Sequence, residues 1–148
     1  MTNRDQELLS AVALIAFKLN GQFLELAERL AQPAGLTATW WQVLGAVLKA
    51  PLSVSAIARQ MGITRQAVQR TADVLVDRGL AEYRVNPAHR RAKLVAITAE
   101  GRAAIAAINP QHARHAGRLT RAIASDQLAD TIAAMTTLSQ ALEALEAD

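Results

Sequence analysis

The stretch from Leu52 to Gly79 most constrains the fold of this chain. Ser53 and Thr64 are each suited to cap the start of a helix, because a hydroxyl accepts a hydrogen bond from a free amide of the first turn. Gly62 can take the left-handed conformation that ends a helix, so one helix stops just before the next begins. The pattern predicts a helix-turn-helix.

The second of these helices has one apolar and one polar face. The apolar positions recur at helical spacing, and the polar positions are Arg65, Gln66, Gln69 and Arg70. Arginine can donate two parallel hydrogen bonds to guanine, and glutamine can pair bidentately with adenine, in the major groove. The N-terminal half of such a helix is where this motif contacts bases. A solvated polar face on an ordinary core helix is the alternative interpretation.

A β-hairpin is expected directly after the second helix. Tyr83 and Val85, then Val95 and Ile97, are alternating apolar positions on two short strands, with turn-forming residues between them. The intervening loop carries basic residues that a hairpin tip cannot bury: His89, Arg90, Arg91 and Lys93. A hairpin in this place is a wing, and an arginine at its tip can enter a narrow minor groove.

Long helices are expected on both sides of this region. Apolar residues recur every three or four positions from about residue 4 to 31, which predicts one amphipathic helix. A stripe of that length packs either on its own chain or in a subunit interface. Thr37 should cap a helix over 38–49, Thr98 one from residue 99, and Ser125 the last one. Pro110 should kink or break the helix near residues 106–110.

Charge and composition narrow the function. Residues 49–102 hold ten lysines and arginines against four acidic residues, whereas both flanking regions are slightly negative. Such a block favours a polyanion as partner, and double-stranded DNA fits it. There is no cysteine, which excludes disulfides and thiolate chemistry. No phosphate loop or nucleophile motif occurs, so no enzyme is expected.

No cofactor, metal site or membrane segment is expected. His112 and His115 would share a helix face, but metal sites normally need three or four ligands. No apolar run approaches the ~20 residues of a membrane span, and the first residues do not look like a signal peptide. A cytoplasmic protein is the default.

The residues in this order and spacing resemble the MarR family of winged helix-turn-helix regulators. The segments that carry the resemblance are Leu36-Thr37, Trp41-Gln42-Val43-Leu44, Ile57-Ala58, Met61-Gly62-Ile63-Thr64, Val68-Gln69-Arg70, Leu75, Arg78-Gly79-Leu80, Pro87, Arg90-Arg91-Ala92, Leu94, Ile97-Thr98 and Gly101-Arg102. The resemblance implies a homodimer on a palindromic site, with Arg91 as the wing residue that reaches the minor groove. It also implies a pocket for a small aromatic or lipophilic effector, which Phe17, Trp40 and Trp41 could line, although large apolar side chains more often pack in a core.

One position departs from the family pattern. His89 stands where the family usually has an aspartate that would pair with a wing arginine. We hypothesise that protonation of His89, which for histidine in general occurs near pH ~6.5, tightens DNA binding. DNA affinity of wild type and His89→Ala measured across that range should then differ in slope, and equal slopes would contradict the idea.

The sequence therefore predicts a mainly α protein with a small β-hairpin wing. Residues 1–35 and 101–148 are expected to form dimerisation helices around a DNA-binding domain at 36–100. The expected function is a ligand-responsive transcriptional repressor. A winged helix that only associates with proteins is the alternative. The residues expected to contact DNA are Ser53, Thr64, Arg65, Gln66, Gln69, Arg70, Arg84, Arg90 and Arg91.

Overall fold

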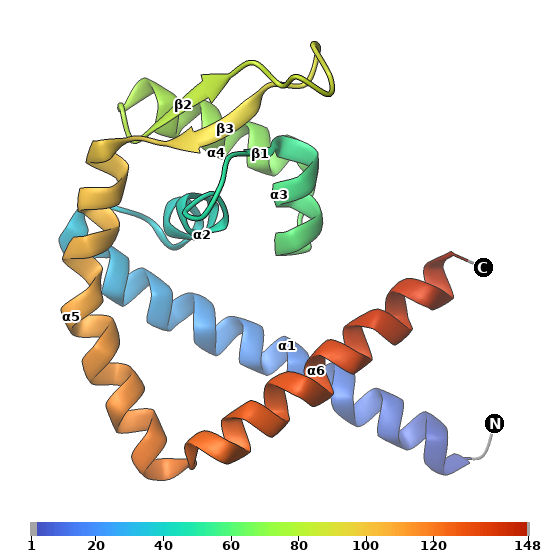
Figure 1. Ribbon diagram of the computed structural model, residues 1–148. Helices are drawn as coiled ribbons and strands as arrows, with labels where there is room; N and C mark the ends of the chain where they lie inside the picture. The colour runs from blue at the N-terminus through green and yellow to red at the C-terminus, as the bar shows by residue number, and fades with distance from the viewer. Residues whose placement is uncertain (1–2, 148) are drawn as a thin grey trace. The chain divides into compact units, whose positions relative to one another are not determined.

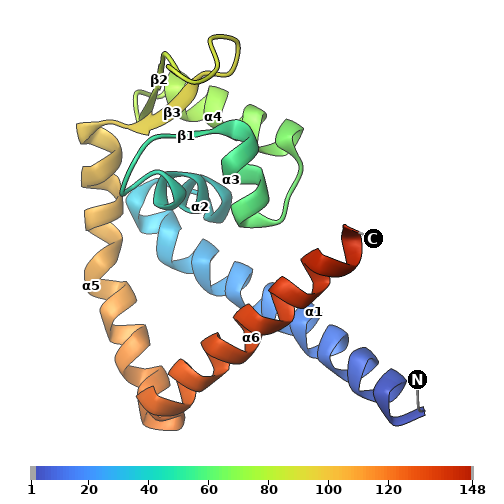
Figure 2. The same ribbon diagram turned by 45° about the vertical axis from the view of Figure 1, so that its right-hand side comes forward.

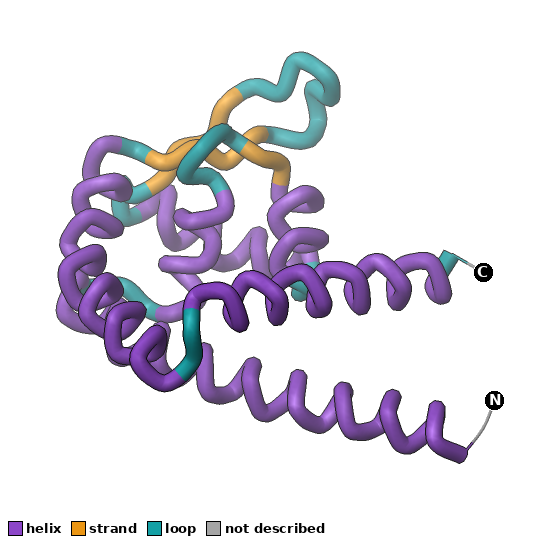
Figure 3. Tube along the Cα trace, turned by 60° about the horizontal axis from the view of Figure 1, so that its bottom comes forward, coloured by secondary structure: helices purple, strands orange, loops and turns teal. Residues whose placement is uncertain are grey.

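A computed structural model describes residues 3–147 of the chain (Figures 1 and 2). The chain forms two compact units, one ending at Asn109 and the other beginning at Pro110. The structure is mainly helical with a small antiparallel sheet, which confirms the expected fold class (Figure 3). The elements are α1 (Asn3–Ala31), η1 (Gln32–Ala34), α2 (Ala38–Ala46), β1 (Leu52–Ser53), α3 (Val54–Met61), α4 (Arg65–Asp77), β2 (Ala81–Arg84), β3 (Leu94–Ile97), α5 (Ala99–Ala122) and α6 (Ser125–Glu146).

The helix-turn-helix consists of α3 and α4, and its predicted caps are confirmed. The Ser53 hydroxyl accepts a hydrogen bond from the Ala56 amide at 3.1 Å, and the Thr64 hydroxyl accepts one from the Ala67 amide at 3.1 Å. Gly62 ends α3 with a φ of 69°, a conformation that favours glycine. These contacts fix the short turn from which α4 starts.

The core of this unit lies where α4 meets α2, α3 and the sheet. The predicted apolar stripe of α4 supplies Val68, Ala72 and Leu75, all fully buried. They pack in one cluster with residues of the neighbouring helices and of β3. Because this face of α4 is buried, its polar face is turned outward.

The predicted hairpin is formed by β2 and β3, with Ala81 opposite Ile97 and Arg84 opposite Leu94. Val85 was expected on the first strand, but the ladder ends at Arg84 and Val85 is 78% exposed in the wing loop. The sheet also has a strand that the sequence did not predict. Strand β1 pairs with β3, so the order is β1-β3-β2.

Helix α2 is held at its start by two side chains. Glu28 of α1 accepts a hydrogen bond from the Ala38 amide at 2.9 Å, and Thr37 accepts one from the Trp40 amide at 3.1 Å, as predicted. The helix ends at Ala46 rather than at residue 49. The chain leaves it through tighter turns, in which the Val47 amide donates to the Leu44 carbonyl at 3.3 Å.

Helix α1 is buried only near its C-terminal end, where Leu30 and Ala31 join the core. Most of its other apolar side chains are exposed. By length and composition, residues 3–34 would also suffice to cross a membrane, because a window of 18 residues within them has a mean hydropathy of 1.3. Their uninterrupted apolar runs stay well short of the ~20 residues of a membrane span. A signal sequence and the core helix of a soluble protein meet the same criteria, so length and composition alone do not assign this helix to a membrane.

Neither a break at Pro110 nor a cap at Ser125 is found in the C-terminal helices, and a kink at Pro110 stays a prediction. Helix α5 continues through Pro110 without a break, so the hydrogen bond lost at the proline does not interrupt the surrounding helical segment. Ser125 is the first residue of α6 rather than its N-cap. The cap position is Ala124, whose amide donates to the Gln127 side-chain oxygen at 3.3 Å.

Candidate nucleic-acid interface

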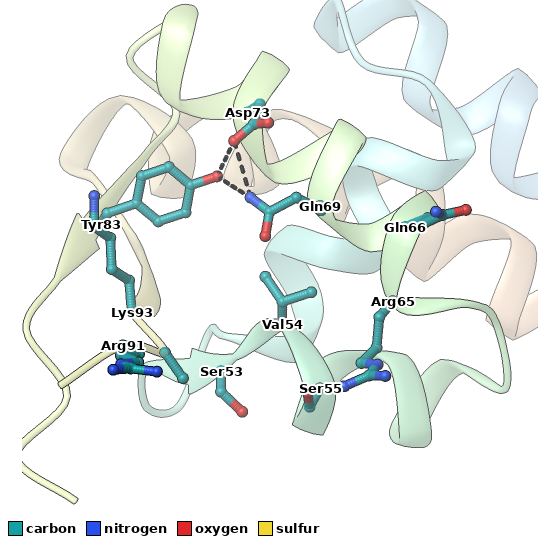
Figure 4. Close-up of a pocket in the computed structure, with 11 residues that line it drawn as sticks. Ser53, Val54, Ser55, Arg65, Gln66, Gln69, Asp73, Tyr83, Arg91 and Lys93 are labelled. Atoms are coloured by element: carbon teal, nitrogen blue, oxygen red, sulfur yellow. Dashed lines mark hydrogen bonds between the residues drawn. The ribbon is translucent and has the colours of Figure 1, made fainter. Parts of the chain in front are cut away.

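A hollow of about 590 Å³ opens between the start of α3, the N-terminal half of α4 and the wing (Figure 4). Three segments that are distant in sequence therefore contribute to one surface. The lining residues are Ser53, Val54, Ser55, Arg65, Gln66, Gln69, Asp73, Tyr83, Arg91, Ala92 and Lys93.

Helix α4 supplies the polar wall of the hollow. Arg65, Gln66 and Gln69 are exposed there, and Asp73 follows one turn after Gln69. This wall lies opposite the buried stripe of the same helix, which fixes its direction. The arrangement presents a guanidinium and two amides from the part of the helix that reads bases in helix-turn-helix proteins.

Asp73, Gln69 and Tyr83 form a hydrogen-bonded trio that joins α4 to β2. The Tyr83 hydroxyl donates to Asp73 Oδ1. The amide nitrogen of Gln69 donates to Asp73 Oδ1 at 3.0 Å and to the Tyr83 hydroxyl oxygen at 2.9 Å. Figure 4 shows both bonds, with the amide oxygen of Gln69 turned away from the other two residues.

The trio shifts the ionisation of both of its acids. Hydrogen bonds from Tyr83 and from Gln69 lower the pKa of Asp73, because they stabilise its carboxylate. Burial, followed by the hydrogen bond to Asp73 and its charge, raises the pKa of Tyr83 to about 12. At neutral pH Asp73 is therefore a charged acceptor and Tyr83 a neutral donor.

The wing loop is organised by Asn86. Its side-chain oxygen accepts from the Ala88 amide at 3.0 Å, and its carbonyl accepts from the His89 amide at 3.2 Å. The loop then returns toward the hollow with Arg91 and Lys93. The Lys93 ammonium lies 5.5 Å from the centre of the Tyr83 ring. A positively charged residue of the wing therefore contacts the trio.

Nine residues were expected to contact DNA, and five of them line the hollow: Ser53, Arg65, Gln66, Gln69 and Arg91. Thr64, Arg70, Arg84 and Arg90 are exposed but do not line it. Arg84 forms an ion pair with Glu82 at 2.8 Å, which balances part of its charge. Ser55, Asp73 and Tyr83 also line the hollow, although none of them was expected at a DNA-binding site.

The residues considered for an effector pocket lie in different environments. Trp40 and Trp41 are half-buried against the core, and the Arg78 guanidinium lies 4.9 Å from the centre of the Trp40 ring. Phe17 is 73% exposed on α1. A pocket formed by the three remains a prediction.

The two histidines of α5 do not belong to a larger ligand set. His115 Nδ1 lies 3.0 Å from the Gln111 carbonyl oxygen. Within residues 3–147, no group of three or more His, Cys, Asp or Glu side chains is arranged to hold a metal ion.

The fold and the hollow together define a winged helix-turn-helix protein. Residues 34–92 match the model of the MarR family. An uncharacterized protein from Mycobacterium tuberculosis is 44% identical over 92 residues, which cover 62% of this chain and 64% of the relative. The chain thus spans just under two thirds of the length of that relative.

Solved structures share the fold over more of the chain. The Mycobacterium tuberculosis transcriptional regulator MosR in complex with DNA aligns with a TM-score of 0.70 at 22% identity, covering 88% of this chain and 96% of that chain. CouR from Rhodococcus jostii, bound to p-coumaroyl-CoA, aligns with a TM-score of 0.74 at 20% identity, covering 86% and 90%. Residues 34–92 are therefore similar to the MarR family, and most of the chain shares the fold of these two solved structures.

Proposed function

We propose that this protein is a homodimeric transcription regulator that binds a palindromic DNA site through α4 and the wing. The observation that carries the proposal is the hollow itself. One surface is lined from two sides: helix α4 contributes Arg65, Gln66 and Gln69, and the wing contributes Arg91 and Lys93. Cationic side chains there can neutralise phosphates, and the amides can contact base edges.

The exposed apolar side chains of α1 support the homodimer. Leu8, Leu14, Ile15 and Phe17 are each more than half exposed, which is unusual for so many large apolar side chains on one helix of a monomeric protein. A second copy of the chain would cover them. Residues 1–35, together with the helices of 101–148, where Ile132 and other apolar residues are also exposed, are our candidates for the dimerisation region.

Release from DNA by a small ligand completes the proposal, with the protein acting as a cytoplasmic repressor. The MosR structure contains DNA and the CouR structure contains p-coumaroyl-CoA, so proteins of this fold bind both kinds of partner. An aromatic or lipophilic anion is the ligand class that we would test first on this chain.

Salt dependence of DNA binding tests the proposal against a winged helix that only associates with proteins. The logarithm of affinity should fall linearly with the logarithm of salt concentration, by roughly 0.9 for each phosphate contacted. A protein-interaction module should bind duplex DNA weakly at every salt concentration. Sedimentation of the free protein should give the mass of a dimer, and a monomer at concentrations that bind DNA would contradict the proposed assembly.

A further inference from the structure

The amide of Gln69 has a fixed orientation. Its nitrogen carries two hydrogens, and it makes one hydrogen bond to Asp73 and one to Tyr83. An ionised carboxylate accepts hydrogen bonds but cannot donate them. Turning the amide over would place its oxygen against Asp73 without a hydrogen between them, so the observed orientation is strongly favoured.

Tyr83 reinforces this orientation. Its only hydroxyl hydrogen is directed to Asp73, which leaves the hydroxyl oxygen to accept from Gln69. The Gln69 amide oxygen is then the group left to face the hollow, as Figure 4 shows. Gln69 therefore differs from a free glutamine, which would offer both a donor and an acceptor.

This difference changes which base edges Gln69 can recognise. A bidentate contact with adenine needs the amide hydrogens for N7 and the amide oxygen for the N6 amino group. With its nitrogen turned toward Asp73 and Tyr83, Gln69 presents its amide oxygen, an acceptor, to the base edge. The donors exposed in the major groove are the amino groups of adenine and cytosine.

We propose that Asp73 and Tyr83 are specificity-determining positioning residues, which hold Gln69 as an acceptor for an exocyclic amino group of adenine or cytosine. The inference rests on the proposed function, because it requires α4 to lie in the major groove. It replaces the bidentate adenine contact that the sequence suggested.

Selection from a pool of random double-stranded oligonucleotides tests this inference. The proteins to compare are wild type, Asp73→Asn, Tyr83→Phe, Gln69→Ala and the control Asp77→Asn. Asp77 is exposed on the same helix but does not line the hollow, so its variant removes the same charge without touching Gln69.

Wild type should enrich adenine or cytosine at one position of each half-site, and the base recovered identifies which amino group is read. In Asp73→Asn the new side chain can donate a hydrogen bond, so the Gln69 amide can turn over. The preference for adenine or cytosine over guanine or thymine at that position should then fall roughly tenfold. Tyr83→Phe should reduce the preference less, because the bond to Asp73 remains. Gln69→Ala should lose it at the same position, and Asp77→Asn should keep it.

A purely structural trio gives a different result. If Asp73→Asn and Tyr83→Phe changed affinity equally for all duplexes and kept the wild-type base preference, the inference would be overturned while the DNA-binding function stood. If wild type showed no salt-dependent binding to the pool, the proposed function itself would fail.

Discussion

Replacing Gly101 by alanine should destabilise the junction between the sheet and α5. A Cβ atom at this position would clash with the carbonyl oxygen of Leu80 and lie 2.8 Å from Cγ1 of Ile97. The Leu80 carbonyl already accepts a hydrogen bond from the Thr98 amide at 3.2 Å. It cannot move away from a new methyl group without weakening that bond, and the adjacent Ile97 is itself buried.

The expected loss of stability follows from three contributions. Forcing a methyl group into a packed site costs about 1–3 kcal/mol. Weakening the bond between Leu80 and Thr98 adds about 1 kcal/mol. Alanine is favoured over glycine within a helix by about 1 kcal/mol, which offsets part of this cost. We therefore expect the free energy of unfolding of Gly101→Ala to fall by roughly 1–3 kcal/mol, and its Tm to fall by roughly 3–10 °C.

Thermal unfolding followed by circular dichroism measures this change. Protein concentration must be held constant, because association of the folded chains raises the apparent stability. Gly117→Ala is the matched control: it lies in the same helix, and nothing lies within 4 Å of its added Cβ. That variant should be as stable as wild type or more stable, by up to about 1 kcal/mol. If Gly101→Ala unfolded at the same temperature as Gly117→Ala, the steric argument would be refuted.

Further predictions concern the trio and the wing. Tyr83 is the single tyrosine of the chain, so the ultraviolet absorbance of its phenolate should titrate with a pKa of about 12, and Asp73→Asn should move this pKa down toward 10.0. Folding raises the pKa of Tyr83, so its protonated hydroxyl should stabilise the folded protein below pH 10.0, and this stabilisation should be lost as the pH rises toward 12. An unfolding free energy that stayed unchanged between these two pH values would contradict this prediction. Arg91→Ala should weaken DNA binding, measured by fluorescence anisotropy, and reduce the slope of log affinity against log salt by about 1. Arg84→Ala should change affinity and slope less, because Arg84 is paired with Glu82 and lies outside the hollow. Equal effects of the two substitutions would contradict the different roles given to these arginines.

The helix-turn-helix could be predicted from sequence because its determinants are local. The side chains of Ser53 and Thr64 accept hydrogen bonds from amides three residues away. The left-handed conformation of Gly62 is fixed by a bond from its own amide to the carbonyl of Ala58, four residues earlier. Strand β1 has no such signal. It has two residues, and its existence depends on pairing Leu52 with Val95, which no short window of sequence reveals.

The hollow was only partly predictable for a related reason. Residue type and helical spacing place Arg65, Gln66 and Gln69 on one face of α4 without reference to the rest of the chain. Tyr83 was assigned as an apolar strand residue from its alternation with Val85. Its hydroxyl nevertheless reaches Asp73 on α4, and this contact depends on how the hairpin packs against the helix.

The same contact gives a physical reason for the unusual wing. The family resemblance suggests that an acid near the wing tip would hold the hairpin, and this chain has His89 there instead. Asn86 orders the wing loop through its side-chain oxygen and its carbonyl, while Asp73 binds the base of the hairpin through Tyr83. A carboxylate in a surface that meets phosphates opposes binding unless its lone pairs serve contacts within the protein. Asp73 accepts two such hydrogen bonds, so its negative charge supports both the position of the wing and the orientation of Gln69.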